Sequence, residues 1–124
     1  MAATNITGEQ FTATIEGNDI VLVDFWAAWC GPCRQFGPIF EKVSEKYEDV
    51  AFVKVDTEAE RDLSGALEIT SIPTIMGFRE NVLVFSHSGV LSEPQLGNIV
   101  EAIGALDMAE VHAKLAASPT QHQH

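Results

Sequence analysis

The chain has 124 residues, of which 46% are hydrophobic and 20% charged, and this composition predicts one globular domain with a substantial buried core. The formal charge of -11, from 18 acidic and 7 basic side chains, would repel phosphate backbones and anionic lipid surfaces, so we expect no nucleic-acid or membrane partner. No apolar run approaches the roughly 20 residues of a membrane span, and the first residues lack a secretory signal pattern, which favours a cytoplasmic protein.

The first half of the chain predicts a helix, a strand, a second helix and a second strand. Apolar side chains at helical spacing predict a short helix over residues 7–16, and residues 20–26 form a β-branched and aromatic run typical of a strand covered on both faces. An apolar stripe predicts an amphipathic helix over 31–47, and alternating residues predict a strand over 51–56. Two strands joined by such a helix predict a parallel βαβ unit.

The second half predicts helices around an antiparallel hairpin. Residues 58–67 have a helical pattern, and the extended runs 74–79 and 82–87 are joined by a connection too short for parallel pairing. Ser92 has capping-box spacing with Gln95 and opens a further helix. This order predicts an α/β fold with a mixed sheet of at least four strands and helices on both faces.

Both cysteines lie in one motif, Trp29-Cys30-Gly31-Pro32-Cys33, directly after the first predicted strand. Cys30, at the junction of strand and helix, would face the unpaired N–H groups and the positive end of the helix, which lower the pKa of a thiol. Cys33 lies almost one turn later and is expected to be more buried, so we expect Cys30 to attack and Cys33 to resolve. Gly31 permits close approach, and Pro32 suits the first helical turn, where a missing N–H costs nothing.

Two other interpretations of the cysteine pair are a zinc site and two ordinary buried thiols. A closed structural zinc site usually has four Cys or His ligands. The chain has four histidines, with no second C-x-x-C and no H-x3-5-H pair, so we expect no metal. The βαβ context makes the motif informative and favours redox chemistry.

Residues 23–33, Val-Asp-Phe-Trp-Ala-Ala-Trp-Cys-Gly-Pro-Cys, resemble the active-site segment of the thioredoxins, and residues 71–74, Ser-Ile-Pro-Thr, resemble their second signature. The resemblance covers about residues 6–106. It implies a thioredoxin fold with a central mixed sheet of four to five strands, including a short strand near Asn5. We therefore expect a thioredoxin domain over 1–106 and a C-terminal extension over 107–124.

The extension offers few signals. Asp107 and Glu110 have capping spacing that predicts a further helical turn or two through Leu115. Residues 118–124 are polar and are expected to be frayed, with His122 and His124 as solvated residues rather than metal ligands.

Asp24 stands inside an otherwise apolar strand, where an unpaired charge is costly and a carboxyl group keeps its proton to higher pH. The resemblance implies that it is the buried acid that helps to deprotonate Cys33, through water. A solvated Asp facing the sheet edge is the alternative. The resemblance also places Lys54 near Asp24, where its charge could modulate the acid, although a solvated strand lysine fits the pattern equally well.

Pro73 stands at the start of a predicted strand, a position where proline is tolerated without any special role. The resemblance implies a cis peptide bond beside the sulfurs that leaves the backbone of Ile72 free to pair with extended substrate. We expect Trp29, Ile72, Gly89 and Val90 to form an apolar rim around the reactive cysteine, where a polypeptide can dock. The alternative is that these side chains are plain core.

Several positions depart from the usual pattern of this family. Arg34 stands where lysine is common. Gly77 interrupts a strand normally filled by an aliphatic residue, which is expected to loosen the packing there. The hairpin turn has Glu80-Asn81 where Asn-Gly is typical, yet Asn tolerates a left-handed φ better than most residues do.

The resemblance implies a monomeric dithiol-disulfide oxidoreductase that reduces protein disulfides. Its partners would be disulfide-containing proteins and a thioredoxin reductase that supplies electrons from NADPH, and it would need no bound cofactor beyond the Cys30–Cys33 disulfide. A thiol oxidase or disulfide isomerase is an alternative enzyme. A binding module with incidental thiols, serving as a processivity or assembly subunit, is an alternative of another class.

Overall fold

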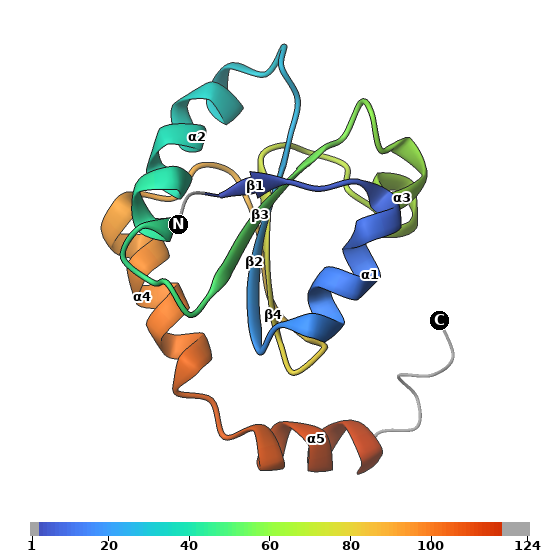
Figure 1. Ribbon diagram of the computed structural model, residues 1–124, viewed down its shortest axis with the longest axis vertical. Helices are drawn as coiled ribbons and strands as arrows, with labels where there is room; N and C mark the ends of the chain where they lie inside the picture. Colours follow the sequence, from blue (N-terminus) through green and yellow to red (C-terminus); the bar gives the residue numbers. More distant parts are fainter. Residues whose placement is uncertain (1–2, 118–124) are drawn as a thin grey trace.

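The computed structural model describes residues 3–117, which form a five-stranded mixed sheet with helices on both faces (Figure 1). The strand order is β1-β3-β2-β4-β5. Strand β2 runs parallel to β3 and antiparallel to β4, and β5 pairs antiparallel with β4. The strands are β1 (Thr4–Asn5), β2 (Ile20–Trp26), β3 (Ala51–Asp56), β4 (Thr74–Arg79) and β5 (Val82–Ser88). The expected fold class is confirmed, including the short first strand.

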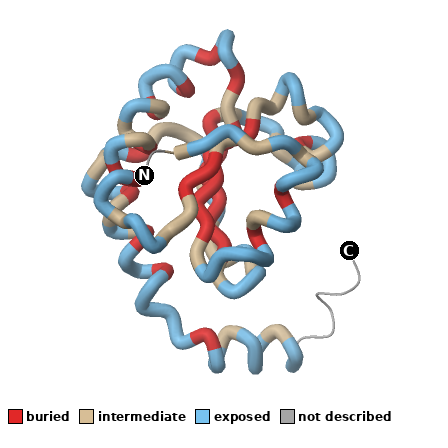
Figure 2. Tube along the Cα trace, in the orientation of Figure 1, coloured by how far each residue is buried: buried red, intermediate tan, exposed pale blue. Residues whose placement is uncertain are grey.

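Five helices complete this part of the chain: α1 (Gly8–Gly17), α2 (Gly31–Ser44), α3 (Arg61–Ala66), α4 (Glu93–Gly104) and α5 (Met108–Ala117). Apolar side chains of α2 and α4 pack on one face of the sheet around Leu22, whereas those of α1 and α3 pack on the other face around Val21 and Val23. Because strand side chains alternate, Asp24 falls on the α2 face with Leu22. The buried centre of the sheet is visible in Figure 2. No helix within residues 3–117 is long and apolar enough to cross a membrane.

Two predicted helix boundaries were wrong. Helix α2 ends at Ser44, not at Tyr47, because the chain turns there with bonds from Lys46 N to the Val43 oxygen and from Tyr47 N to the Ser44 oxygen. Helix α3 begins at Arg61, not at residue 58. The carboxylate of Asp56 accepts the N–H groups of residues 58 and 59, at 2.9 and 3.4 Å, and holds the intervening segment in a turn.

The expectation that Gly77 loosens the sheet was also wrong. A Cβ at this position would lie 2.7 Å from Ile103 Cδ1 and 3.3 Å from Phe85 Cβ. The side chain of Ile103, on α4, therefore occupies the space that an aliphatic residue at position 77 would take. Ile103 thus fills the space that Gly77 leaves, and the sheet and α4 are closely packed at this point.

The C-terminal helix α5 is longer than expected and lies at the end of the sheet opposite the β2–α2 connection (Figure 1). Arg79 Nη1 donates to the carbonyl oxygens of Ile103, Gly104 and Leu106 at 2.8, 3.0 and 3.3 Å, which fixes the end of α4. On α5, Met108 is buried and His112 Nε2 lies 2.9 Å from Glu80 Oε1 in the hairpin turn. Glu80 and Asn81 both adopt positive φ, at 51° and 67°. The tail with His122 and His124 lies outside the described residues.

Candidate active site

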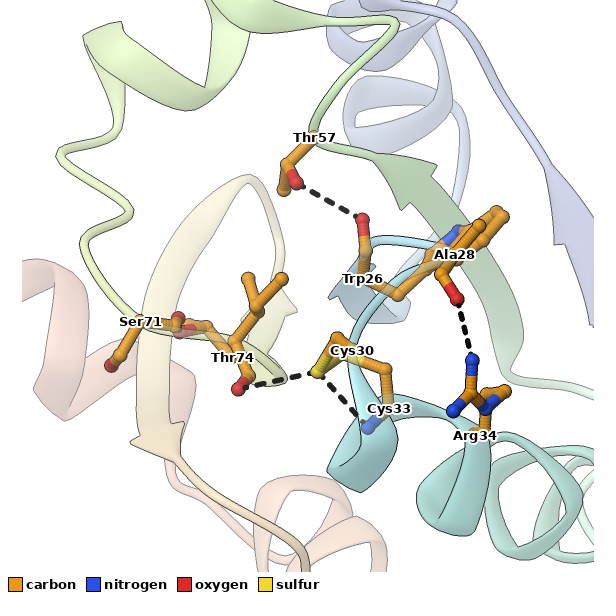
Figure 3. Close-up of a disulfide and its surroundings, with 9 residues drawn as sticks. Trp26, Ala28, Cys30, Cys33, Arg34, Thr57, Ser71 and Thr74 are labelled. Atoms are coloured by element: carbon orange, nitrogen blue, oxygen red, sulfur yellow. Dashed lines mark hydrogen bonds between the residues drawn. A yellow bond between two sulfur atoms is a disulfide. The ribbon is translucent and has the colours of Figure 1, made fainter.

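The cysteine pair lies where β2 gives way to α2. Cys30 is the N-cap residue of α2, with φ -90° and ψ 115°, and its Sγ accepts the backbone N–H of Cys33 at 3.2 Å. The two sulfurs form a disulfide, with the Cα atoms 5.2 Å apart (Figure 3). Pro32 occupies the first turn of α2, where its missing N–H leaves no partner unsatisfied. The first sulfur therefore faces backbone donors at the positive end of a helix.

Burial does not distinguish the two sulfurs, contrary to the expectation that Cys33 is the more buried. Cys30 is 4% exposed and Cys33 is 5% exposed, because Ile72 packs over this cluster from the opposite loop. The two residues differ instead in surroundings: Cys30 Sγ lies 3.7 Å from the carbonyl oxygen of Ile72, whereas Cys33 lines a pocket with Asp24. The two cysteines therefore differ in their position in the helix and not in how far they are buried.

The loop opposite the disulfide carries the second signature. The Ile72–Pro73 peptide bond is cis, and the carbonyl oxygen of Pro73 accepts the N–H of Gly89 at 2.8 Å. The Thr74 hydroxyl donates to the carbonyl oxygen of Ser71 at 2.5 Å. The Gly89–Pro73 bond ties the loop before β4 to the segment after β5, and Ile72 of this loop packs against the cysteines.

Asp24 is 1% exposed and lies at the base of an open pocket of about 500 Å³ that Cys33 and Lys54 also line. Neither carboxylate oxygen has a hydrogen-bond partner within the described residues. Burial raises the pKa of Asp24 to about 7, against a smaller opposing effect of the positive charge of Lys54. The carboxyl group is therefore buried on the α2 side of the sheet and is poised to ionise near neutral pH.

Lys54 reaches this pocket from the neighbouring strand. It is the register partner of Asp24, and its Nζ lies 5.3 Å from the centroid of the Trp26 ring, a distance typical of a cation–π contact. The half-buried lysine thus lies over an aromatic face and lines the same pocket as the acid, without a direct ion pair between the two within residues 3–117.

The expected rim residues occupy different environments. Trp29 is 67% exposed beside the disulfide, and Ile72 is half-buried against the sulfurs. Gly89 adopts a φ of 113°, which favours glycine, and Val90 packs against the core shared by α2 and α4. The apolar surface beside the disulfide therefore comes mainly from Trp29 and Ile72.

Two residues that no sequence pattern had marked as part of the site hold the segment between β2 and Cys30 in place (Figure 3). Arg34 Nη1 donates to the carbonyl oxygen of Ala28 at 3.0 Å. Thr57 donates its backbone N–H and its hydroxyl to the carbonyl oxygen of Trp26, at 2.8 and 3.1 Å. Both fix the segment between β2 and Cys30, and only tertiary proximity could have identified them.

Residues 3–117 contain no group of three or more His, Cys, Asp or Glu side chains that could hold a metal ion. The two sulfurs at the junction are joined to each other, and such a disulfide can exchange with thiolates.

Comparisons with known proteins agree with this geometry. The thioredoxin family model matches residues 2–102. A Streptomyces coelicolor protein assigned as a thioredoxin 2 is 47% identical over 116 residues, which cover 94% of this chain and 87% of that protein. A chloroplastic thioredoxin z structure superposes with a TM-score of 0.79 at 33% identity, covering 86% of this chain and 97% of that one. A Plasmodium falciparum thioredoxin gives 0.75 at 30% identity, covering 81% and 98%. The chain belongs to the thioredoxin family and is a protein-disulfide oxidoreductase.

Proposed function

We propose that the protein is a general reductase of protein disulfides in which Cys30 attacks the substrate and Cys33 resolves the mixed disulfide. The observation that carries this proposal is the position of Cys30 at the N-cap of α2, where its sulfur accepts a backbone N–H from Cys33. Such a setting stabilises a thiolate relative to a thiol. Cys33, inside the first turn, is within bonding reach of Cys30 and lacks that position.

The proposed reaction transfers two electrons. In the reduced protein the Cys30 thiolate attacks one sulfur of the substrate disulfide, forming a mixed disulfide and releasing the other substrate sulfur as a thiolate. Cys33, once deprotonated, attacks the Cys30 sulfur and forms the Cys30–Cys33 disulfide. The second substrate sulfur then leaves as a thiolate. The second step is intramolecular and benefits from a high effective concentration.

Asp24 is proposed as the group that takes the proton from Cys33. Its carboxyl group lines the same pocket as Cys33, and a pKa of about 7 allows it to accept and to release a proton near neutral pH. The pocket is open to solvent and can hold the water that would carry the proton between them. Lys54 is proposed to favour the ionised form of Asp24 and so to tune this step.

Substrate is proposed to dock as an extended segment across Trp29 and Ile72, with the backbone beside Pro73 available for pairing. The exposure of Trp29 and the close approach of Ile72 to Cys30 support this docking surface. Gly89 and Val90 are proposed to shape its far border, with Gly89 held to Pro73 by a backbone bond. Gly31 and Pro32 would keep the loop between the sulfurs compact.

Recycling is proposed to use a thioredoxin reductase that draws electrons from NADPH and reduces the Cys30–Cys33 disulfide of a monomer in the cytoplasm. The absence of further cysteines supports a reducing compartment, because a lone pair without structural disulfides is typical of one. No bound cofactor enters this scheme, since the disulfide itself carries the two electrons.

Insulin reduction by the Cys30→Ser variant tests the proposal. We expect a loss of at least about a thousandfold in rate with an unchanged circular dichroism spectrum, because the attacking sulfur is gone. The matched variant Cys33→Ser should instead accumulate a mixed disulfide with insulin, visible by mass spectrometry. Full activity of Cys30→Ser in a partner-assembly assay would favour a binding module.

An equilibrium titration against glutathione or dithiothreitol separates the two enzymatic alternatives. A potential near or below that of the cytosolic glutathione pool would support a reductase, whereas a much higher potential would indicate an oxidase or isomerase.

A further inference from the structure

A second pocket, of about 290 Å³, shares no lining residue with the pocket of Asp24. Trp29 and Ile72 line it, and the rest of its wall comes from α3 and the segments directly before and after that helix. A substrate segment that crosses Trp29 and Ile72 would present a neighbouring side chain to this pocket. The chemistry of its wall therefore bears on which substrates are preferred.

The charged residues that line this pocket are Glu58 and Arg61. Arg61 Nη2 lies 2.8 Å from Glu58 Oε1, and the two side chains are 76% and 48% exposed. A guanidinium group has five N–H donors, so one contact with a carboxylate oxygen leaves donors for a second acceptor. Two nearby carboxylates are engaged elsewhere: Asp56 accepts the N–H of Glu58, and Glu60 accepts the N–H of Gly8 at 2.7 Å.

The uncharged polar groups of the wall do not favour one kind of entering side chain over the other. The hydroxyls of Thr57 and Ser64 already donate to carbonyl oxygens of the chain itself, and the hydroxyls of Thr70 and Ser71 can donate or accept, so any charge preference comes from Arg61 and Glu58. An entering amine would compete with Arg61 for Glu58. An entering carboxylate would meet the unused N–H groups of Arg61 at an exposed but preformed ion pair.

We propose that Arg61 is a specificity-determining residue that binds an acidic side chain, Asp or Glu, beside the cysteine of the substrate disulfide. The proposal rests on the reductase function proposed above. The net charge of -11 repels acidic proteins as a whole, so the preference concerns a single acid next to the reacting disulfide. Trp29 supplies the apolar contact and Arg61 the charged one.

Two disulfide-linked peptides that differ by Asp or Asn at one position beside the target cysteine test this assignment, with each flanking position scanned in turn. We expect the wild-type protein to show kcat/KM about two- to fivefold higher for Asp at one position, the size expected of an exposed charge pair. Arg61→Gln/Glu58→Gln should bring this ratio to one, because it removes the donor without leaving an unpaired carboxylate. Glu58→Gln alone should keep or raise the ratio.

Lys114→Gln/Glu110→Gln is the matched control, because Lys114 and Glu110 form a similar exposed ion pair, 3.2 Å apart, on α5. Like the double variant at Arg61 and Glu58, it removes one exposed ion pair without changing the net charge, and it should leave the ratio at the wild-type value. A wild-type ratio of one at every position, or a preference that persists in Arg61→Gln/Glu58→Gln, would overturn the role of Arg61. Failure of the wild-type protein to reduce either peptide would instead refute the reductase function itself.

Discussion

At the disulfide end of the sheet, the buried carboxylate of Asp24 has no hydrogen-bond partner within residues 3–117, whereas at the opposite end the guanidinium of Arg79 has several. Arg79 Nε has no hydrogen-bond partner in the described part of the chain and lies 3.5 Å from the carboxylate of Asp19. An unpaired buried acid lowers stability when it ionises, and a partly buried cation held by carbonyls at a helix C-terminus raises it. The carboxyl group of Asp24 thus lowers stability at the end where we propose proton transfer, whereas Arg79 holds the end of α4 in place at the other.

Asp24→Asn is the substitution with the largest expected effect on this contrast. Between the ordinary pKa of 3.8 and the folded value of about 7, the native state holds a proton that the unfolded chain has lost, so stability falls as pH rises through this window. Asn does not ionise. We therefore expect the free energy of unfolding of the variant to exceed that of the wild type by up to about 4 kcal/mol near pH 8, with little difference near pH 3.

Urea unfolding of the oxidised proteins at the two pH values measures this gain, and a difference that does not change with pH would contradict the buried ionisation. The same variant should reduce insulin about tenfold more slowly, because the proton acceptor for Cys33 is lost. Identical kinetics across the pH range would remove Asp24 from the reaction while leaving its effect on stability intact.

Arg79→Met should act in the opposite sense at the other end of the sheet. It removes the donor to three carbonyl oxygens, and we expect the free energy of unfolding to fall by about 2 kcal/mol. Insulin reduction by the folded variant should match the wild type, since Arg79 is far from the disulfide end. Reduced kcat/KM in a variant of wild-type stability would show that the two ends are coupled.

Gly77→Ala probes the packing between the sheet and α4. The added Cβ would lie 2.7 Å from Ile103 Cδ1, so we expect a loss of about 1–2 kcal/mol in chemical denaturation. Ile103→Val removes that Cδ1 and is the matched partner. The double variant should lose less than the sum of the two single changes, and strict additivity would mean that Ile103 does not fill the glycine space.

The elements predicted most accurately were those with a strong strand pattern. Strand β2 runs over the predicted residues because Ile20–Trp26 is nearly all β-branched, aliphatic or aromatic, the residue types that favour strands. Helix α2 stops before Tyr47 although the apolar stripe continues, because backbone bonds of Lys46 and Tyr47 turn the chain after Ser44. The start of α3 depends on the side chain of Asp56, and a period of apolar residues does not reveal such a bond.

The sequence also predicted some site residues better than others, because a local pattern reveals a motif but not a contact between distant segments. Cys30 and Cys33 follow from a motif and its place between a strand and a helix, whereas propensity alone leaves Pro73 an ordinary proline at a strand start. Only the family resemblance suggested its cis bond. The approach of Arg61 to Trp29 joins segments that are distant in sequence, so no local pattern could reveal it.

Alkylation of the reduced protein across a pH series, with the modified cysteine mapped by mass spectrometry, tests the central claim most directly. We expect Cys30 to react as a thiolate at neutral pH, with a pKa below the ordinary value of about 8.5, and Cys33 to react only at higher pH. Modification of Cys33 first, or a Cys30 that titrates like a free thiol, would contradict the assignment of Cys30 as the attacking sulfur.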